Sequence, residues 1–156
     1  MSQLLVAIRI RGRVGVPPDK KYTLDLLRLR RKHVAVLLKN TPEILGMLNK
    51  VSDYITWGEI SREALIELLK KRGRTVGDKP ITEEFLKARG FNSIEELADA
   101  LLEGRIAYKD IPGIKPVFRL TPPSGGFKGT LKKHYKIGGE LGYRGEAINE
   151  LVKKMI

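Results

Sequence analysis

Short apolar segments alternate with amphipathic segments over the first 60 residues of the chain. Residues 4–10 alternate as in a β-strand, with Val6 and Ile8 on one side. Residues 34–38 form a continuous apolar run, which is typical of a buried strand. Residues 54–57 predict a third strand. The pattern therefore predicts three strands that are separated by two helical segments.

The first helical segment is predicted over about residues 24–32, with Thr23 as its N-cap. It follows a basic loop, residues 11–21, whose glycines and prolines end the first strand. A helical wheel places three basic residues opposite the apolar face. A basic helix face is often only solvated, so solvation and RNA contact both remain open for these residues, which are Arg28, Arg31 and Lys32.

The second helical segment opens with Thr41 at the N-cap and Pro42 in the first turn. Its apolar residues follow at i, i+3, i+4 and i+7, which places them in one apolar stripe along the helix. Gly46 falls opposite that stripe, beside Asn49 and Lys50. A glycine within a helix costs about 1 kcal/mol relative to alanine. Gly46 is therefore either a place where a nucleic-acid backbone approaches closely or an unoptimised surface position.

The order β-α-β-α-β predicts a compact α+β core over residues 1–60. Residues 61–156 are predicted to form an extension that ends in a Gly-rich basic arm and a terminal helix. The arm holds 8 glycines, 7 Lys or Arg and a single acid, Glu140, and such a long irregular stretch is usually functional or disordered. The expected parts of the extension are helices 62–72, 83–89 and 94–103, which Ser61, Thr82 and Ser93 are predicted to cap, the arm 113–145, and helix 146–155.

Charge is distributed unevenly along the chain, which carries a formal net charge of +12. Residues 1–60 contain 11 Lys and Arg against 5 Asp and Glu, residues 61–105 contain 9 against 9, and residues 106–156 contain 10 against 4. Phosphate backbones are the polyanion that a basic protein most often meets, and their neutralisation releases counterions. The two basic ends are therefore predicted to form two separate RNA-binding surfaces, with a neutral middle that stays away from phosphate.

Arg9, Arg11 and Arg13 recur at every second residue, so we expect them on one side of the strand and its continuation. Guanidinium groups match phosphate oxygens. The alternative is a charged edge strand that prevents aggregation, but no acid occurs before Asp19. In the arm, Phe127 and Tyr135 can stack on bases. Further candidates for RNA contact are Lys20, Lys21, Lys115, Arg119, Lys128, Lys132, Lys133, His134 and Lys136.

Catalytic and metal-binding roles are poorly supported. The chain has no cysteine and two histidines, of which His33 is expected to be a partly buried structural residue. The acids of helix 94–103 are expected on its solvent face rather than as an acid–base pair. No apolar run approaches the ~18 residues of a membrane span, and no secretory signal is recognisable. We therefore expect a cytoplasmic protein with no cofactor, membrane or small-molecule substrate.

The run of residues 41–51, TPEILGMLNKV, is similar to the central signature of the universal large-subunit ribosomal protein L-thirty family. The opening strand, with Arg9 to Gly12, and the Thr23–Leu29 segment resemble the same family in order and spacing. Residues 1–60 correspond to the short bacterial form. The remainder, including the stretches 118–123 and 138–144, resembles the archaeal and eukaryotic extension, whose eukaryotic members are called ribosomal protein L-seven.

The resemblance implies a ferredoxin-like β-α-β-α-β core with a helical and extended basic addition. It also implies a structural, non-enzymatic role in binding large-subunit rRNA near the 5S rRNA, among neighbouring ribosomal proteins. The alternative is a free-standing RNA assembly factor or chaperone. By resemblance, RNA contact is expected at Arg9, Arg11, Arg13, Lys50, Lys132, Lys133, His134 and Arg144.

Overall fold

A mixed six-stranded sheet organises the computed structural model, which describes residues 4–156. Its strand order is β6-β2-β1-β3-β8-β7, and a separate two-stranded ribbon joins β4 to β5. The predicted α+β class and the β-α-β-α-β opening are confirmed. The strands are β1 (Leu4–Arg9), β2 (Val34–Lys39), β3 (Ile55–Glu59), β4 (Arg74–Thr75), β5 (Lys79–Pro80), β6 (Phe118–Arg119), β7 (Thr130–His134) and β8 (Gly139–Tyr143).

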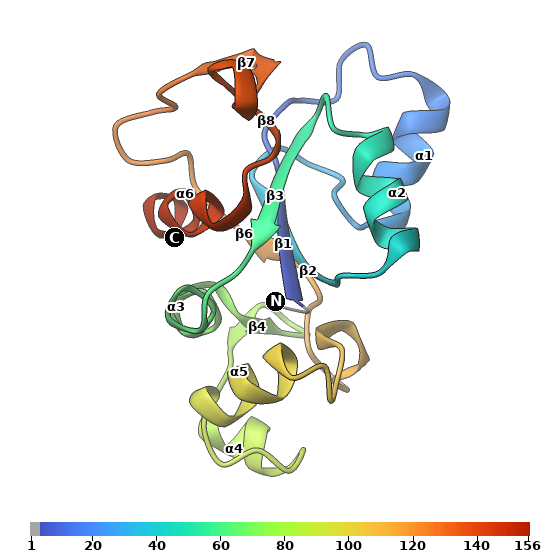
Figure 1. Cartoon of the computed structure of the whole chain (residues 1–156). Coiled ribbons are helices and arrows are strands. Elements are labelled where there is room, and N and C mark those ends of the chain that lie inside the picture. Colours follow the sequence, from blue (N-terminus) through green and yellow to red (C-terminus); the bar gives the residue numbers. More distant parts are fainter. Residues whose placement is uncertain (1–3) are drawn as a thin grey trace.

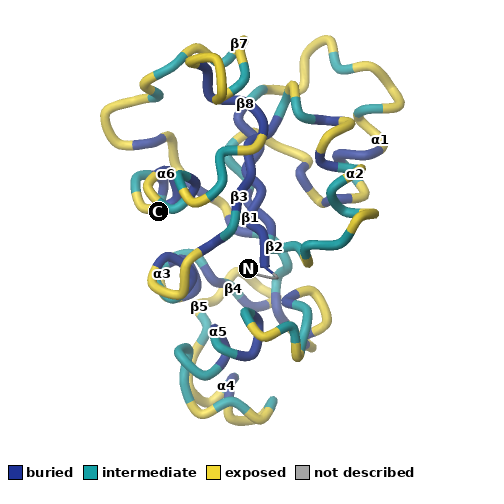
Figure 2. The backbone as a smooth tube through the Cα atoms, viewed as in Figure 1, coloured by how far each residue is buried: buried dark blue, intermediate teal, exposed yellow. Residues whose placement is uncertain are grey.

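Helices cover both faces of the sheet, and β1 lies buried between them (Figure 1, Figure 2). Residues Val6 and Ile8 of β1 belong to one apolar core, with α3, α5 and α6. Leu5 and Ala7 belong to a second core, with α1 and α2. The helices are α1 (Pro18–Leu26), α2 (Pro42–Lys50), α3 (Arg62–Arg72), α4 (Glu83–Lys87), α5 (Ile94–Leu102) and α6 (Ile148–Met155).

Helix starts in the middle of the chain coincide with the polar caps that the sequence predicts. The Thr41 hydroxyl accepts the Ile44 N–H at 3.2 Å, and the Ser61 hydroxyl accepts the Ala64 N–H at 3.1 Å. At α5, the Ser93 hydroxyl accepts the N–H of the third helical residue at 3.2 Å. Each cap satisfies a backbone donor that the first helical turn cannot pair.

The predicted helix over 24–32 is wrong, because α1 begins at Pro18 and ends at Leu26. Pro18 occupies the first turn of the helix. Proline has no backbone N–H, but an N–H at this position would have no partner within the helix, so nothing is lost. Thr23 is not a cap: it is buried inside the helix and donates its hydroxyl to the Asp19 carbonyl at 3.2 Å. Residues 27–33 form an irregular connection, since Arg28 and His33 adopt φ of 63° and 67°. The expected basic helix face is therefore an exposed connecting segment.

The arm over 113–145 is more regular than its composition suggests. It supplies β6, which pairs antiparallel with β2, and β8, which pairs parallel with β3. Strand β7 then pairs with β8 at the sheet margin. The arm thus extends both edges of the sheet, because backbone pairing to an existing edge satisfies its donors and acceptors without needing an alternating apolar pattern.

Gly58 in β3 permits the close approach of the turn that leads into α6. A Cβ atom at this position would collide with the Gly145 carbonyl oxygen and lie 3.0 Å from Ile148 Cγ2. Gly46 in α2 differs, because a Cβ atom there would meet nothing within 4 Å. The two glycines therefore have different structural consequences.

Replacing Gly58 by alanine is expected to lower the free energy of unfolding by about 1–3 kcal/mol, because the turn and α6 must shift. Gly46→Ala is the matched control and is expected to raise that free energy by up to about 1 kcal/mol, through helix propensity alone. Urea unfolding followed by circular dichroism measures both. Equal stability of the Gly58→Ala variant and the parent protein would contradict the packing described here.

Candidate nucleic-acid interface

Cationic segments from distant parts of the sequence meet at one end of the sheet. The β1–α1 loop with the first turn of α1, the C-terminal end of α2, and strand β7 with the turn that follows it all lie there (Figure 1). We call this region the head–arm surface. Its basic residues are Arg11, Arg13, Lys20, Lys21, Lys50, Lys132, Lys133, His134 and Lys136.

Asp53 connects the head of the chain to the arm within this surface. Its carboxylate lies 3.6 Å from Lys20 Nζ and 3.3 Å from His134 Nε2. The Arg11 guanidinium donates to the Asp53 carbonyl oxygen at 3.2 Å and lies 5.6 Å from the Tyr54 ring centroid. The two basic ends, which were expected to form separate surfaces, are therefore adjacent and share one carboxylate.

A small polar cavity of about 170 Å³ lies where α2 meets the arm. Asn49 lines it from the end of α2, and His134 and Lys136 line it from the arm. Asn49 and Lys50 are exposed, as is Gly46 one turn earlier. The outward-facing end of the 41–51 signature thus lies next to the basic arm.

Arg9 does not reach the surface, although the sequence pattern groups it with Arg11 and Arg13. It is 3% exposed, and its guanidinium donates to the Leu29 carbonyl at 2.8 Å, the Arg11 carbonyl at 2.9 Å and the Gly12 carbonyl at 3.1 Å. Those bonds tie the end of β1 to the loop after it and to the 27–33 connection. Arg9 is therefore a structural residue and is excluded from the head–arm surface.

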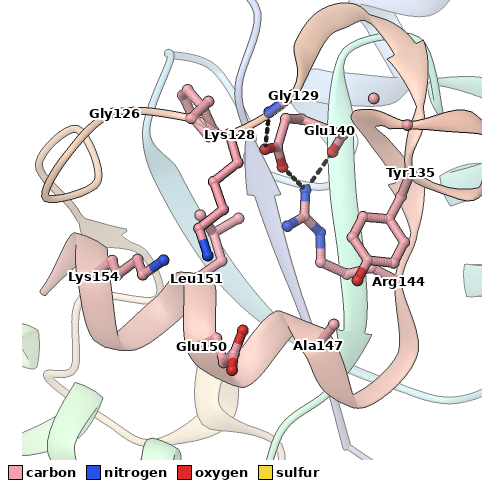
Figure 3. Close-up of a pocket in the computed structure, with 13 residues that line it drawn as sticks. Gly126, Lys128, Gly129, Tyr135, Glu140, Arg144, Ala147, Glu150, Leu151 and Lys154 are labelled. Carbon is pink, nitrogen blue, oxygen red and sulfur yellow. Dashed lines mark hydrogen bonds and ion pairs between the residues drawn. The ribbon is translucent and has the colours of Figure 1, made fainter.

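Arg144 is likewise engaged inside the molecule (Figure 3). Its side chain is 6% exposed and pairs with the Glu140 carboxylate at 2.6 Å, while its Nε donates to the Thr56 hydroxyl at 2.8 Å. Glu140 also accepts the Gly129 N–H at 2.9 Å. The guanidinium lies 4.8 Å from the Tyr135 ring centroid. The arm's one acid and this arginine fix the arm to β3.

The same close-up shows Lys128 and Lys154 beside a cavity of about 410 Å³, which Glu150 also lines (Figure 3). Phe127, which was expected to stack on bases, instead lies 6.5 Å from the His33 ring, centroid to centroid. Burial, followed by the charge of Lys32, lowers the pKa of His33. The neutral form of the His33 imidazole is therefore favoured.

The 27–33 connection exposes the predicted residues Arg28, Arg31 and Lys32, and also Arg30. The helical wheel missed Arg30 because this segment is not helical; the unbroken run of basic residues was the available signal. Lys115 and Arg119, from the start of the arm, lie in a different cleft, away from Asp53.

Known proteins match this chain at two levels: a family model matches the core, and full-length relatives match the core and the extension together. The family model described as "Ribosomal protein L30p/L7e" matches residues 5–55, which run from β1 to the start of β3. "Large ribosomal subunit protein uL30" of Thermofilum pendens is 53% identical over 98% of this chain and 99% of its own length. The chain belongs to the uL30 family.

Two further uL30 proteins agree with this assignment. That of Staphylothermus marinus is 54% identical over 100% of both chains. That of Hyperthermus butylicus is 56% identical over 99% of this chain and 91% of its own length. Because these archaeal matches include the extension, the chain is the long form of uL30, and the prediction of a structural ribosomal protein rather than an enzyme is confirmed. No helix within residues 4–156 is long and apolar enough to cross a membrane.

The structural role of Arg9 predicts that Arg9→Gln lowers the free energy of unfolding by about 2–3 kcal/mol, because buried carbonyls lose a charged donor. The salt dependence of rRNA binding is expected to stay unchanged. Arg13→Gln, at an exposed position, is the matched control. It should leave the free energy of unfolding unchanged and reduce the salt dependence of rRNA binding. Thermal unfolding and rRNA binding at several salt concentrations are measured for both variants. A changed salt slope for Arg9→Gln, with no loss of stability, would place Arg9 at the interface.

Proposed function

We propose that this uL30 protein is a structural constituent of the large ribosomal subunit and binds large-subunit rRNA through the head–arm surface. The observation that carries the proposal is the convergence of the β1–α1 loop, the end of α2 and the arm on one end of the sheet, around Asp53. Placement near the 5S rRNA rests on the family resemblance. The relatives' names, which refer to the large ribosomal subunit, support the assembly.

The head–arm surface suits recognition of folded RNA by charge and shape. Its cations are mostly exposed lysines and arginines, and the carboxylate of Asp53 balances only part of their charge. Contacts to phosphate and sugar position a protein without reading base sequence. Because the cations come from a loop, a helix end and the arm, which gather at one end of the sheet, the surface presents a defined pattern of charge to the RNA.

The helical side of the molecule differs, since its charges pair with one another. Arg62 pairs with Asp99 at 2.7 Å between α3 and α5, and Lys153 pairs with Glu63 at 3.1 Å between α6 and α3. Lys70 likewise pairs with Glu95. Paired surface charges attract phosphate weakly, so we propose that this side faces solvent or neighbouring ribosomal proteins.

A free-standing RNA assembly factor would use the same surface but exchange between targets. Sedimentation of cell extract separates the two roles. A structural constituent is expected to stay with the large subunit through a high-salt wash, whereas release into the supernatant would overturn the proposal.

Replacing Lys132, Lys133 and Lys136 together by glutamate is expected to weaken rRNA binding and to reduce the slope of log K against log salt by up to about 3 units, since each phosphate contact contributes roughly 0.9. The matched control replaces three exposed lysines outside the surface, Lys39, Lys87 and Lys109. Filter binding of rRNA fragments at several salt concentrations measures the slopes. Similar slopes for the two variants would move the interface elsewhere.

A bulky residue at Gly46 is expected to disturb docking more than folding, because this position is exposed and open. Gly46→Leu should therefore incorporate poorly into large subunits while unfolding at a temperature close to that of Gly46→Ala, its control. Subunit incorporation in cells and thermal unfolding of the pure variants measure the two effects. Normal incorporation of Gly46→Leu would show that no RNA approaches this helix face.

A further inference from the structure

A second concentration of positive charge lies outside the head–arm surface, where residues 61–105 meet the start of the arm. It surrounds a cleft of about 140 Å³ between the end of α3, β4 and the start of the arm. We call this the middle cleft. Its lining residues are Arg72, Arg74, Asp78, Lys115, Val117 and Arg119.

Main-chain hydrogen bonds hold the two sides of the middle cleft together. The Lys115 N–H donates to the Arg74 carbonyl at 2.9 Å, and the Val76 N–H donates to the Gly113 carbonyl at 2.8 Å. The Arg74 guanidinium is itself placed by a 2.8 Å bond to the Gly73 carbonyl. The backbone on both sides of the cleft and the Arg74 guanidinium are therefore in place before any ligand arrives, which lowers the entropic cost of binding an anion.

The charge of the middle cleft is largely unbalanced. Four cations face one acid, Asp78, which lies 3.7 Å from Lys115 and is 58% exposed in its side chain. Elsewhere in residues 61–105, Arg62 and Arg105 each pair with a carboxylate at 2.7 Å. Only two of the four cations, Arg72 and Arg74, belong to residues 61–105, and the arm supplies Lys115 and Arg119. The neutral middle of the chain and the basic arm therefore form this cationic cleft together.

We infer that the middle cleft binds a phosphodiester of the same RNA, as an anchor separate from the head–arm surface; this inference rests on the proposed function. Three of its four cations are guanidinium groups, which bind phosphate oxygens in a bidentate manner. Arg119 in β6 pairs in register with Val34. The 27–33 connection, which exposes Arg28, Arg30, Arg31 and Lys32, ends directly before that residue. The cleft thus adjoins a second arginine-rich segment, which favours RNA over a short acidic peptide.

The test uses the full-length chain and transcripts of large-subunit rRNA. Arg72→Gln together with Arg74→Gln is expected to reduce the slope of log K against log salt by up to about 2 units. Lys115→Gln with Arg119→Gln, which alters the cleft from the arm side, should give a similar loss. Asp78→Asn should strengthen binding. The matched control, Arg62→Gln with Arg105→Gln, removes two guanidinium groups that are already paired and should leave the slope unchanged.

The outcomes separate the two proposals. If the parent protein binds rRNA with a steep salt dependence and both cleft variants keep its slope, the middle cleft is not an RNA anchor. In that case this inference fails while the proposed function stands. If the cleft variants keep the slope but incorporate poorly into subunits, the cleft contacts an acidic protein surface, which also overturns the inference. If the parent protein shows no salt-dependent binding to rRNA, the proposed function itself fails.

Discussion

Burial of β1 on both faces is the constraint on which the rest of the structure depends. Its alternate side chains enter two different cores, so both faces of the sheet must be covered by helices. That requirement fixes α1 and α2 on one side and α3, α5 and α6 on the other. It also fixes which segments lie at each end of the sheet, and the head–arm surface is built from the β1–α1 loop, the end of α2 and β7 at one end.

The buried arginines show how a basic protein keeps its cationic segments in place. Arg9 uses its donors on three backbone carbonyls, and Arg144 uses its donors on Glu140 and Thr56. A buried guanidinium is stable only when hydrogen bonds replace its lost hydration. These two residues hold the loop and the arm in position, whereas neighbours such as Arg13 and Lys132 stay exposed at the surface.

Local pairing, rather than segment charge, decides where the surface attracts phosphate. Asp53 lies among the head and arm cations and draws them together without neutralising them. Between α3 and α5, Arg62 and Lys70 each pair with a carboxylate, which weakens their attraction for phosphate. The middle cleft departs from this pattern because Asp78 alone faces four cations.

The sequence by itself determined the class of fold, the order of the first five elements, the capped starts of α2, α3 and α5, and the family. These features follow from periodicity and from polar groups within a few residues of one another. The start of α1 was missed, because Thr23 resembles a cap as much as Pro18 resembles a first turn, and only packing of Leu24 and Leu27 into the second core selects between them. Tertiary structure alone decided that Arg9 and Arg144 are buried, that the arm pairs with both sheet edges, and that Arg74 and Lys115 share a cleft. Side chains far apart in sequence meet only through the folded backbone, and the free energy of a charge depends on the partners and the burial that it finds there.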